Sequence, residues 1–149
     1  MINNVIEALA RALKVNFKDS KKYTIYTENV EQGLKQPCFF VYSKGYRDEL
    51  YRGKRYRLST DIIIEYIPPK PENDSNTNAN VNEILPKLYD ATEEIDIEGN
   101  IILRGLERTV ENTEGGVIFN VRYEYFYWKN EDEEKMEVLK ERTNINGFK

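Results

Sequence analysis

The sequence predicts an α+β fold, with a single domain built on a mainly antiparallel sheet of four to five strands. Two helices are expected to pack on one face of this sheet, and a long β-hairpin is expected to project from it. The prediction rests on two periods. Apolar residues recur every three or four positions in 2–17 and 81–95, as in amphipathic helices. They alternate with polar residues in 55–67 and 117–127, as in strands with one covered face.

The first 16 residues or so form the first predicted helix. Its apolar stripe consists of Ile2, Val5, Ile6, Leu9, Leu13 and Phe17. A polar turn at 19–22 ends this helix, and the β-branched and aromatic residues of 23–26 then favour a short strand.

The longest predicted feature is a hairpin over residues 36–69. Its first arm, 37–46, opens with an apolar run, which is typical of a strand covered on both faces. Its second arm is the alternating stretch 55–67. Between the arms lies a basic, tyrosine-containing tip, where Gly45 and Gly53 allow the backbone to turn. Such a tip is too polar for the core, so it is either solvated or in contact with a partner.

The polar loop 70–80 is expected to be disordered, because it has almost no apolar side chains to bury. A helix follows from roughly 80 to 94, and Pro86 indicates that it either begins near Leu85 or kinks there. A turn at 98–100 leads to a strand that starts at Ile101 and fades into charged residues. The last strand, 117–127, is expected to pack centrally.

The helix-covered face of the sheet is expected to carry the cleanest alternation of apolar residues. The predicted members of this face are Tyr56, Leu58, Ile62, Ile64, Val117, Phe119, Val121 and Tyr123. Residues 1–129 then form the domain, and residues 130–149 form a charged C-terminal arm or a short helix.

Charge is distributed unevenly along the chain. The net charge is -4 and the sequence pI is about 5.1, which argues against a protein that grips nucleic acid by neutralising phosphates. Residues 44–57 nevertheless carry six basic and two acidic side chains, a local balance of +4. Residues 131–137 carry five acidic side chains and one basic, a local balance of -4. This separation favours contacts between proteins.

The sequence predicts no catalytic, cofactor-binding or metal site. There is no histidine, which excludes imidazole-dependent triads and histidine metal sites, and the single Cys38 lies in an apolar run typical of a buried thiol. Asp61 and Glu65 share a strand face but would stand ~13 Å apart, too far for a pair of glycosidase carboxylates. The N-terminus lacks the pattern of a secretory signal, and no apolar run is long enough to span a membrane.

The hairpin tip is the best candidate for a binding surface. Tyrosine and arginine are enriched at protein interfaces, and both are frequent here. The predicted contact residues, to a neighbouring subunit or to another protein, are Tyr46, Arg47, Tyr51, Arg52 and Arg55. The alternative is a solvated loop with no contact.

The element order and several phrases of the sequence resemble a known family. The phrases are INNVIEALARALK, QPCFFVY, YRLSTDIIIEYIP and GGVIFNVRYEYFYW, and the resemblance covers about residues 1–129. They are similar to the small tail terminator, or tail completion, proteins of phages and prophages of Gram-positive bacteria. The resemblance implies a virion protein without enzymatic activity, made in the host cytoplasm, which forms a hexameric ring on the tail tube and stops its polymerisation.

The same resemblance implies the partners. They are other copies of the chain, the tail tube protein, the sheath protein if the tail is contractile, and a head-completion protein. DNA can pass through such a ring, but no specific nucleic-acid binding and no membrane contact are implied. Two alternatives remain open: another neck or head–tail joining protein, and an unrelated small protein-binding module such as an immunity-type protein.

Overall fold

The computed structural model describes residues 2–17, 22–27, 33–69 and 77–129. The chain divides into two compact units. The first comprises Met1–Tyr46 and Ser59–Glu124, and the second comprises Arg47–Leu58 and Tyr125–Lys149. We call the described part of the second unit, residues 47–58 and 125–129, the ribbon.

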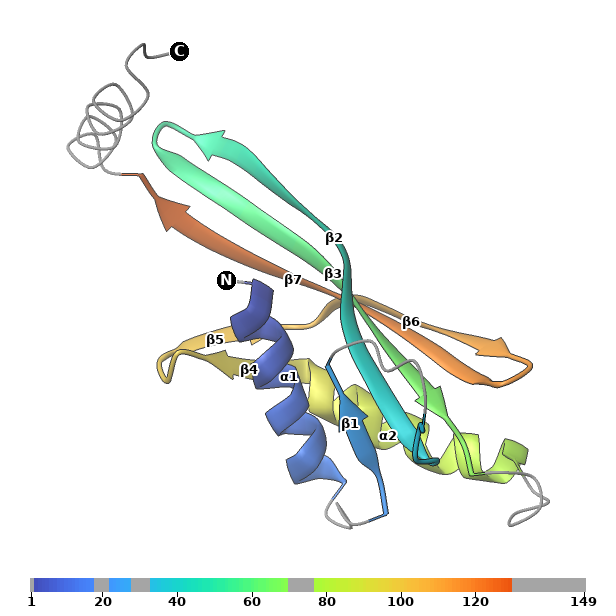
Figure 1. Ribbon diagram of the computed structural model, residues 1–149. Helices are drawn as coiled ribbons and strands as arrows, with labels where there is room; N and C mark the ends of the chain where they lie inside the picture. The colour runs from blue at the N-terminus through green and yellow to red at the C-terminus, as the bar shows by residue number, and fades with distance from the viewer. Residues whose placement is uncertain (1, 18–21, 28–32, 70–76, 130–149) are drawn as a thin grey trace, which may run out of the picture. The chain divides into compact units, whose positions relative to one another are not determined.

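The order of elements confirms the predicted α+β class (Figure 1). Two helices and a mostly antiparallel sheet make up the fold. The elements are α1 (Ile2–Asn16), β1 (Thr24–Tyr26), β2 (Cys38–Arg52), β3 (Arg55–Ile67), α2 (Thr77–Glu93), β4 (Glu94–Ile97), β5 (Ile101–Arg104), β6 (Leu106–Thr113) and β7 (Gly116–Trp128).

The main sheet has five strands in the order β1-β2-β3-β7-β6, so β7 is internal, as predicted. Strand β1 runs parallel to β2, whereas β6 runs antiparallel to β7. Strands β4 and β5 form a separate antiparallel pair, which no pattern in the sequence predicted. The turn between them falls at 98–100, as predicted.

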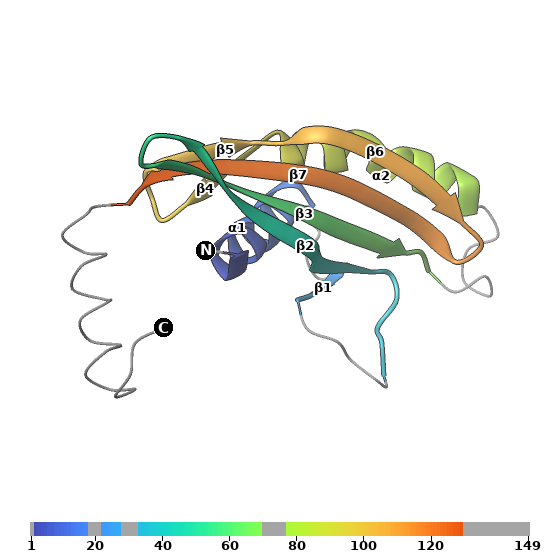
Figure 2. The same cartoon turned by 90° about the horizontal axis from the view of Figure 1, so that it is seen from above.

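Both helices lie on the same side of the sheet in the first unit (Figures 1 and 2). Ring contacts link the helices to this face. The ring centroids of Phe17, just after α1, and Phe39 of β2 are 4.8 Å apart, and those of Tyr89 of α2 and Phe119 of β7 are 5.0 Å apart. The largest fully buried side chains are Tyr66, Tyr123, Phe17, Phe39, Phe119, Leu9, Leu13, Ile62, Ile64, Ile84, Leu88 and Ile95. Cys38 is also buried, which raises the pKa of its thiol.

The predicted helix-covered face is confirmed for its six members in the first unit. Ile62, Ile64 and the four residues of β7 are all buried there. The prediction is wrong for Tyr56 and Leu58, which are only half-buried and belong to the ribbon. The alternation of β3 continues into the ribbon, but strand period alone does not show where a covering layer ends.

Helix α2 begins earlier than predicted. It starts at Thr77 and continues through Pro86, so the loop prediction is wrong for 77–80, while 70–76 lie outside the described residues. Asn80 is buried and accepts a hydrogen bond from the Tyr66 hydroxyl, and Val81 and Ile84 are buried in the same part of the helix. These tertiary contacts outweigh the cost of about 3 kcal/mol for an interior proline.

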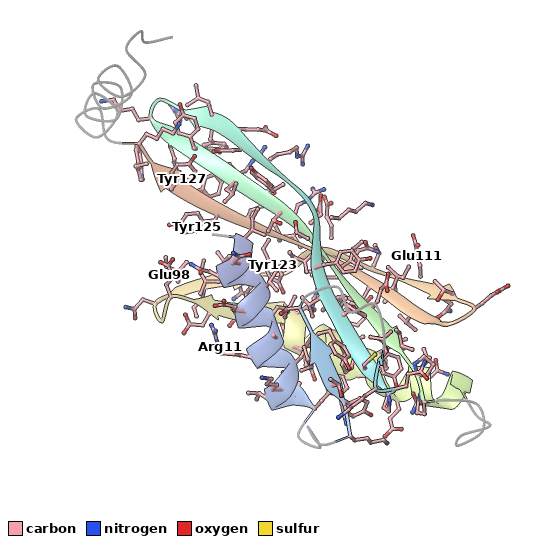
Figure 3. The ribbon with its side chains drawn as sticks, in the orientation of Figure 1. Arg11, Glu98, Glu111, Tyr123, Tyr125 and Tyr127 are labelled. Carbon is pink, nitrogen blue, oxygen red and sulfur yellow. The ribbon has the colours of Figure 1, made fainter. Side chains whose placement is uncertain are left out.

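The strand predicted from Ile101 onward is in fact two strands separated by Gly105. The Gly105 amide donates to the Glu93 carbonyl at 2.9 Å, and a Cβ at this position would lie 2.3 Å from the Thr92 carbonyl oxygen. Only glycine allows this close approach of the backbones. The β4–β5 pair is fixed to α1 as well, because Arg11 donates to the Asp96 carbonyl at 3.2 Å (Figure 3).

Candidate interaction surface

The predicted basic tip is part of strands β2 and β3 rather than a long loop. Gly45 lies inside β2, and the reversal is confined to Gly53 and Lys54. Gly53 has φ 59°, and a positive φ at the first central position is typical of a type II′ hairpin turn. The Lys129 amide donates to the Lys54 carbonyl at 3.0 Å, which places the end of β7 beside the turn.

One face of the ribbon gathers arginines and aromatic rings. We call Tyr51, Arg55, Arg57, Phe126 and Trp128 the cation–aromatic face. The Arg55 guanidinium carbon lies 4.3 Å from the Phe126 ring centroid, 5.6 Å from that of Tyr51 and 6.0 Å from that of Trp128. Tyr51 and Phe126 also meet edge to face, with centroids 5.1 Å apart. Each such contact is favourable because the ring face is electron-rich.

The cation–aromatic face is open to solvent and short of hydrogen-bond acceptors. Trp128 is 70% exposed and Tyr51 is 54% exposed. Arg57 Nη2 lies 3.4 Å from Glu49 Oε2, and Glu49 Oε1 is 3.8 Å from Arg47 Nε; exposed pairs at such distances contribute little. Arg55 Nε is buried and has no hydrogen-bond partner in the described part of the chain.

The opposite face of the ribbon is rich in tyrosine. Tyr127 stacks on Tyr56 and on Tyr125, its neighbour along β7 (Figure 3), with centroids 5.6 and 6.3 Å away. The Tyr127 hydroxyl donates to Asp48 at 2.6 Å, and the Lys129 ammonium lies 4.4 Å from the Tyr56 ring centroid. The hydrogen bond to Asp48, together with partial desolvation, raises the pKa of Tyr127 to about 12.

The five predicted contact residues do not form one patch. Tyr51 and Arg55 lie on the cation–aromatic face, and Arg47 is linked to that face through Glu49. Arg52 follows Tyr51 in an extended strand, so its side chain lies on the opposite face. Tyr46 is the last residue of its segment of the first unit, where it is 60% exposed. The acidic segment 131–137 lies outside the described residues.

The sequence-based prediction missed three of the five residues of the cation–aromatic face. Phe126 and Trp128 alternate with Tyr125 and Tyr127 along β7, and this alternation in YEYFYW was the available signal. Arg57 was counted in the basic stretch but was not selected as a contact residue. Its alternation with Arg55 on β3 would have placed both on one face.

Asp61 and Glu65, considered above as possible acid and base, each have a structural partner in the first unit. Arg122 lies between two carboxylates, with Nε 2.9 Å from Asp61 and Nη1 2.9 Å from Glu107. Glu107 adopts a left-handed φ of 48° where the pairing of β6 with β7 shifts register. The Tyr42 hydroxyl donates to Glu65 at 2.8 Å, and desolvation together with this bond raises the pKa of Tyr42 to about 12.

Two further observations concern the described residues alone. They contain no group of three or more histidine, cysteine, aspartate and glutamate residues that could hold a metal ion. Neither described helix is long and apolar enough to cross a membrane.

Comparison with known proteins identifies the family. A search of curated proteins found no match. Among 24 matching chains of known structure, one is 12% identical and covers 83% of this chain and 96% of its own length, with a TM-score of 0.39, which is too low to support an assignment. The family described as phage tail terminator protein matches residues 4–135, nearly the whole chain. The chain therefore belongs to the phage tail terminator proteins.

Proposed function

We propose that this protein forms a ring on the finished tail tube, stops tube polymerisation and offers a surface to which the head is joined. The match to the terminator family over residues 4–135 carries this proposal. Membership of that family makes the chain a structural protein of the virion tail that associates with other tail components. A cap on a tube must leave the bore open for DNA, and a closed ring of subunits meets that requirement.

The proposed ring is a hexamer, as the family resemblance implied. A ring closes through a head-to-tail contact, in which two different patches of the subunit meet. The chain offers stretches of opposite charge: residues 44–57 with a balance of +4 and residues 131–137 with a balance of -4. We propose that the basic stretch meets either the acidic segment of a neighbour or the tail tube, with Tyr46, Arg47, Tyr51, Arg52 and Arg55 as the candidate contact residues.

The other proposed partners are the tail tube protein, the sheath protein if the tail is contractile, and a head-completion protein. Assembly is proposed to take place in the host cytoplasm. An exposed face with tryptophan, tyrosine and arginine supports a role in protein contacts, because these residues dominate binding energy at interfaces.

The test uses the full chain and the assembled tail. We expect native mass spectrometry and electron microscopy to show rings, and phage that lack the protein to make tails of irregular length without heads. The triple variant Arg47→Glu, Arg52→Glu, Arg55→Glu should keep the thermal melting of the wild type but lose ring formation or tail capping.

A matched control reverses charge in the first unit at Lys14 and Arg104, whose side chains are exposed. This control should assemble like the wild type. Tails of uniform length joined to heads, formed in the absence of the protein, would refute the capping function. Rings and capping that survive in the triple variant would exclude the basic stretch as the contact.

A further inference from the structure

The cation–aromatic face has the residue composition that is typical of the centre of a protein–protein interface. Its aromatic rings are exposed, and the three rings that contact Arg55 in the described part of the chain belong to the ribbon itself. Tryptophan, tyrosine and arginine are the residues that most often form hot spots of binding energy. A solvated surface gains nothing from holding Trp128 70% exposed beside a half-buried arginine.

The chemistry of this face selects a carboxylate-bearing partner. Arg55 is half-buried, and its buried Nε has no acceptor in the described part of the chain, so a carboxylate that binds the rest of the guanidinium would compensate a charge that its own ribbon leaves poorly satisfied. Arg57 makes a weak approach to Glu49 at 3.4 Å and lies 6.0 Å from the Tyr51 ring centroid, and a better-placed carboxylate could replace Glu49. A docked partner would exclude water from the flanking rings, and the lower local dielectric would then strengthen an ion pair formed against them.

The chain carries a segment with this chemistry. Residues 131–137 contain Glu131, Asp132, Glu133, Glu134 and Glu137 against the single Lys135. They begin two residues after Lys129, whose amide is bonded to the Lys54 carbonyl at the turn of the ribbon. To reach the face of its own ribbon, the chain would have to reverse at once, and a reversal uses about four residues. Most of the carboxylates would then lie in the turn and could not contact the face, whereas the segment of a neighbouring copy can present all of them.

We propose that the acidic segment 131–137 of one copy docks on the cation–aromatic face of a second copy. This inference rests on the proposed function for the closure of a ring, but the pairwise contact itself does not depend on a ring. It keeps Tyr51 and Arg55 of the five predicted contact residues and replaces the other three with Arg57, Phe126 and Trp128. Arg55 and Arg57 bind carboxylates, and Tyr51, Phe126 and Trp128 provide the apolar surroundings.

A charge swap in the full chain tests the docking. The face variant carries Arg55→Glu and Arg57→Glu, and the segment variant carries Glu131→Lys, Glu133→Lys and Glu134→Lys. Each variant alone presents like charges at every contact, so its self-association should weaken roughly tenfold or more. A one-to-one mixture should recover association, because both kinds of contact in an alternating assembly then pair opposite charges. The control Lys14→Glu with Arg104→Glu should associate like the wild type.

The readouts are sedimentation velocity and the fluorescence of Trp128, which is the only tryptophan in the sequence. Association should change the Trp128 emission, and 1 M salt should reverse the change because the Debye length falls to about 3 Å. If the wild type is monomeric in solution, a synthetic peptide of residues 130–149 is added to the segment variant. Its binding should shift the Trp128 emission, and the face variant with the same segment reversals should show no shift.

Three results would overturn the docking. The first is self-association as strong as the wild type's in either reversed variant, and the second is a Trp128 emission that the peptide does not change. The third is association that recovers only when both sets of reversals are in one chain. The last result would mean that the segment binds its own ribbon. The proposed function is judged separately. Peptide binding without rings would leave the contact standing and remove the ring, whereas rings in both reversed variants would remove the contact and leave the ring.

Discussion

Replacing Ile62 by alanine should test which face of the sheet is the core, and its neighbour Ile63 provides the matched control. Ile62 is 0% exposed, whereas Ile63 is half-buried on the other face of β3. The substitution removes three carbons, and each buried methylene contributes about 0.8 kcal/mol, so the transfer loss alone is roughly 2.4 kcal/mol. A residual cavity adds to this loss, which gives an expected range of about 2–5 kcal/mol.

Ile63→Ala removes the same atoms from a half-exposed position, where no closed cavity can form. Its expected cost is therefore about 1 kcal/mol. Urea unfolding of both variants measures the difference, at protein concentrations where the chain is monomeric, because assembly would add stability through mass action. The slope of the transition should stay constant. A loss below about 0.5 kcal/mol for Ile62→Ala, or equal losses for the two variants, would refute the assignment of the faces.

Two further substitutions test single close contacts. Gly116 has φ 148°, and a Cβ there would lie 2.0 Å from the Tyr66 carbonyl oxygen, so Gly116→Ala should cost about 3 kcal/mol or more in urea unfolding. Gly115→Ala, which meets nothing within 4 Å, should stay within about 0.5 kcal/mol of the wild type, and equal effects would contradict the close approach. Tyr123→Phe removes a hydroxyl that donates to the Thr92 carbonyl at 2.9 Å and should cost about 1 kcal/mol at pH 8. Burial holds the pKa of Tyr123 well above its ordinary value, so the free energy of unfolding of the wild type should fall as the pH rises above about 10, the ordinary pKa of tyrosine. The Tyr123→Phe variant should lose less stability over the same pH range. Equal losses in the two proteins would contradict the raised pKa of Tyr123.

The regular parts of the fold were predictable from the sequence because their periods are long and clean. The stripe of α1 and the alternation of β7 each span more than three repeats and agree with the structure. Two errors came from tertiary contacts. The start of α2 depends on the bond between Tyr66 and Asn80, and the break at Gly105 depends on the nearby Thr92 carbonyl. Neither contact leaves a local pattern in the sequence.

The candidate surface was predictable in its location but not in its composition. The density of arginine and tyrosine in 44–57 indicated the right hairpin, and the strand period could have divided these residues between two faces. The contribution of Phe126 and Trp128 comes from a strand about 70 residues further along the chain. Which residue lies opposite Arg55 depends on strand register, and register follows from pairing in space rather than from composition.

The ribbon has no fully buried large side chain among its described residues, whereas the first unit contains all of those identified in the core. Substitutions at the exposed positions of the ribbon therefore cost little free energy of unfolding, since such positions rarely contribute more than about 0.5 kcal/mol. During evolution the exposed side chains of the ribbon can therefore be replaced one at a time while the protein keeps the stability that folding requires. Terminators built in this way can adapt to changes in a partner's surface through substitutions in the ribbon, while the residues of the helix-covered core stay constant.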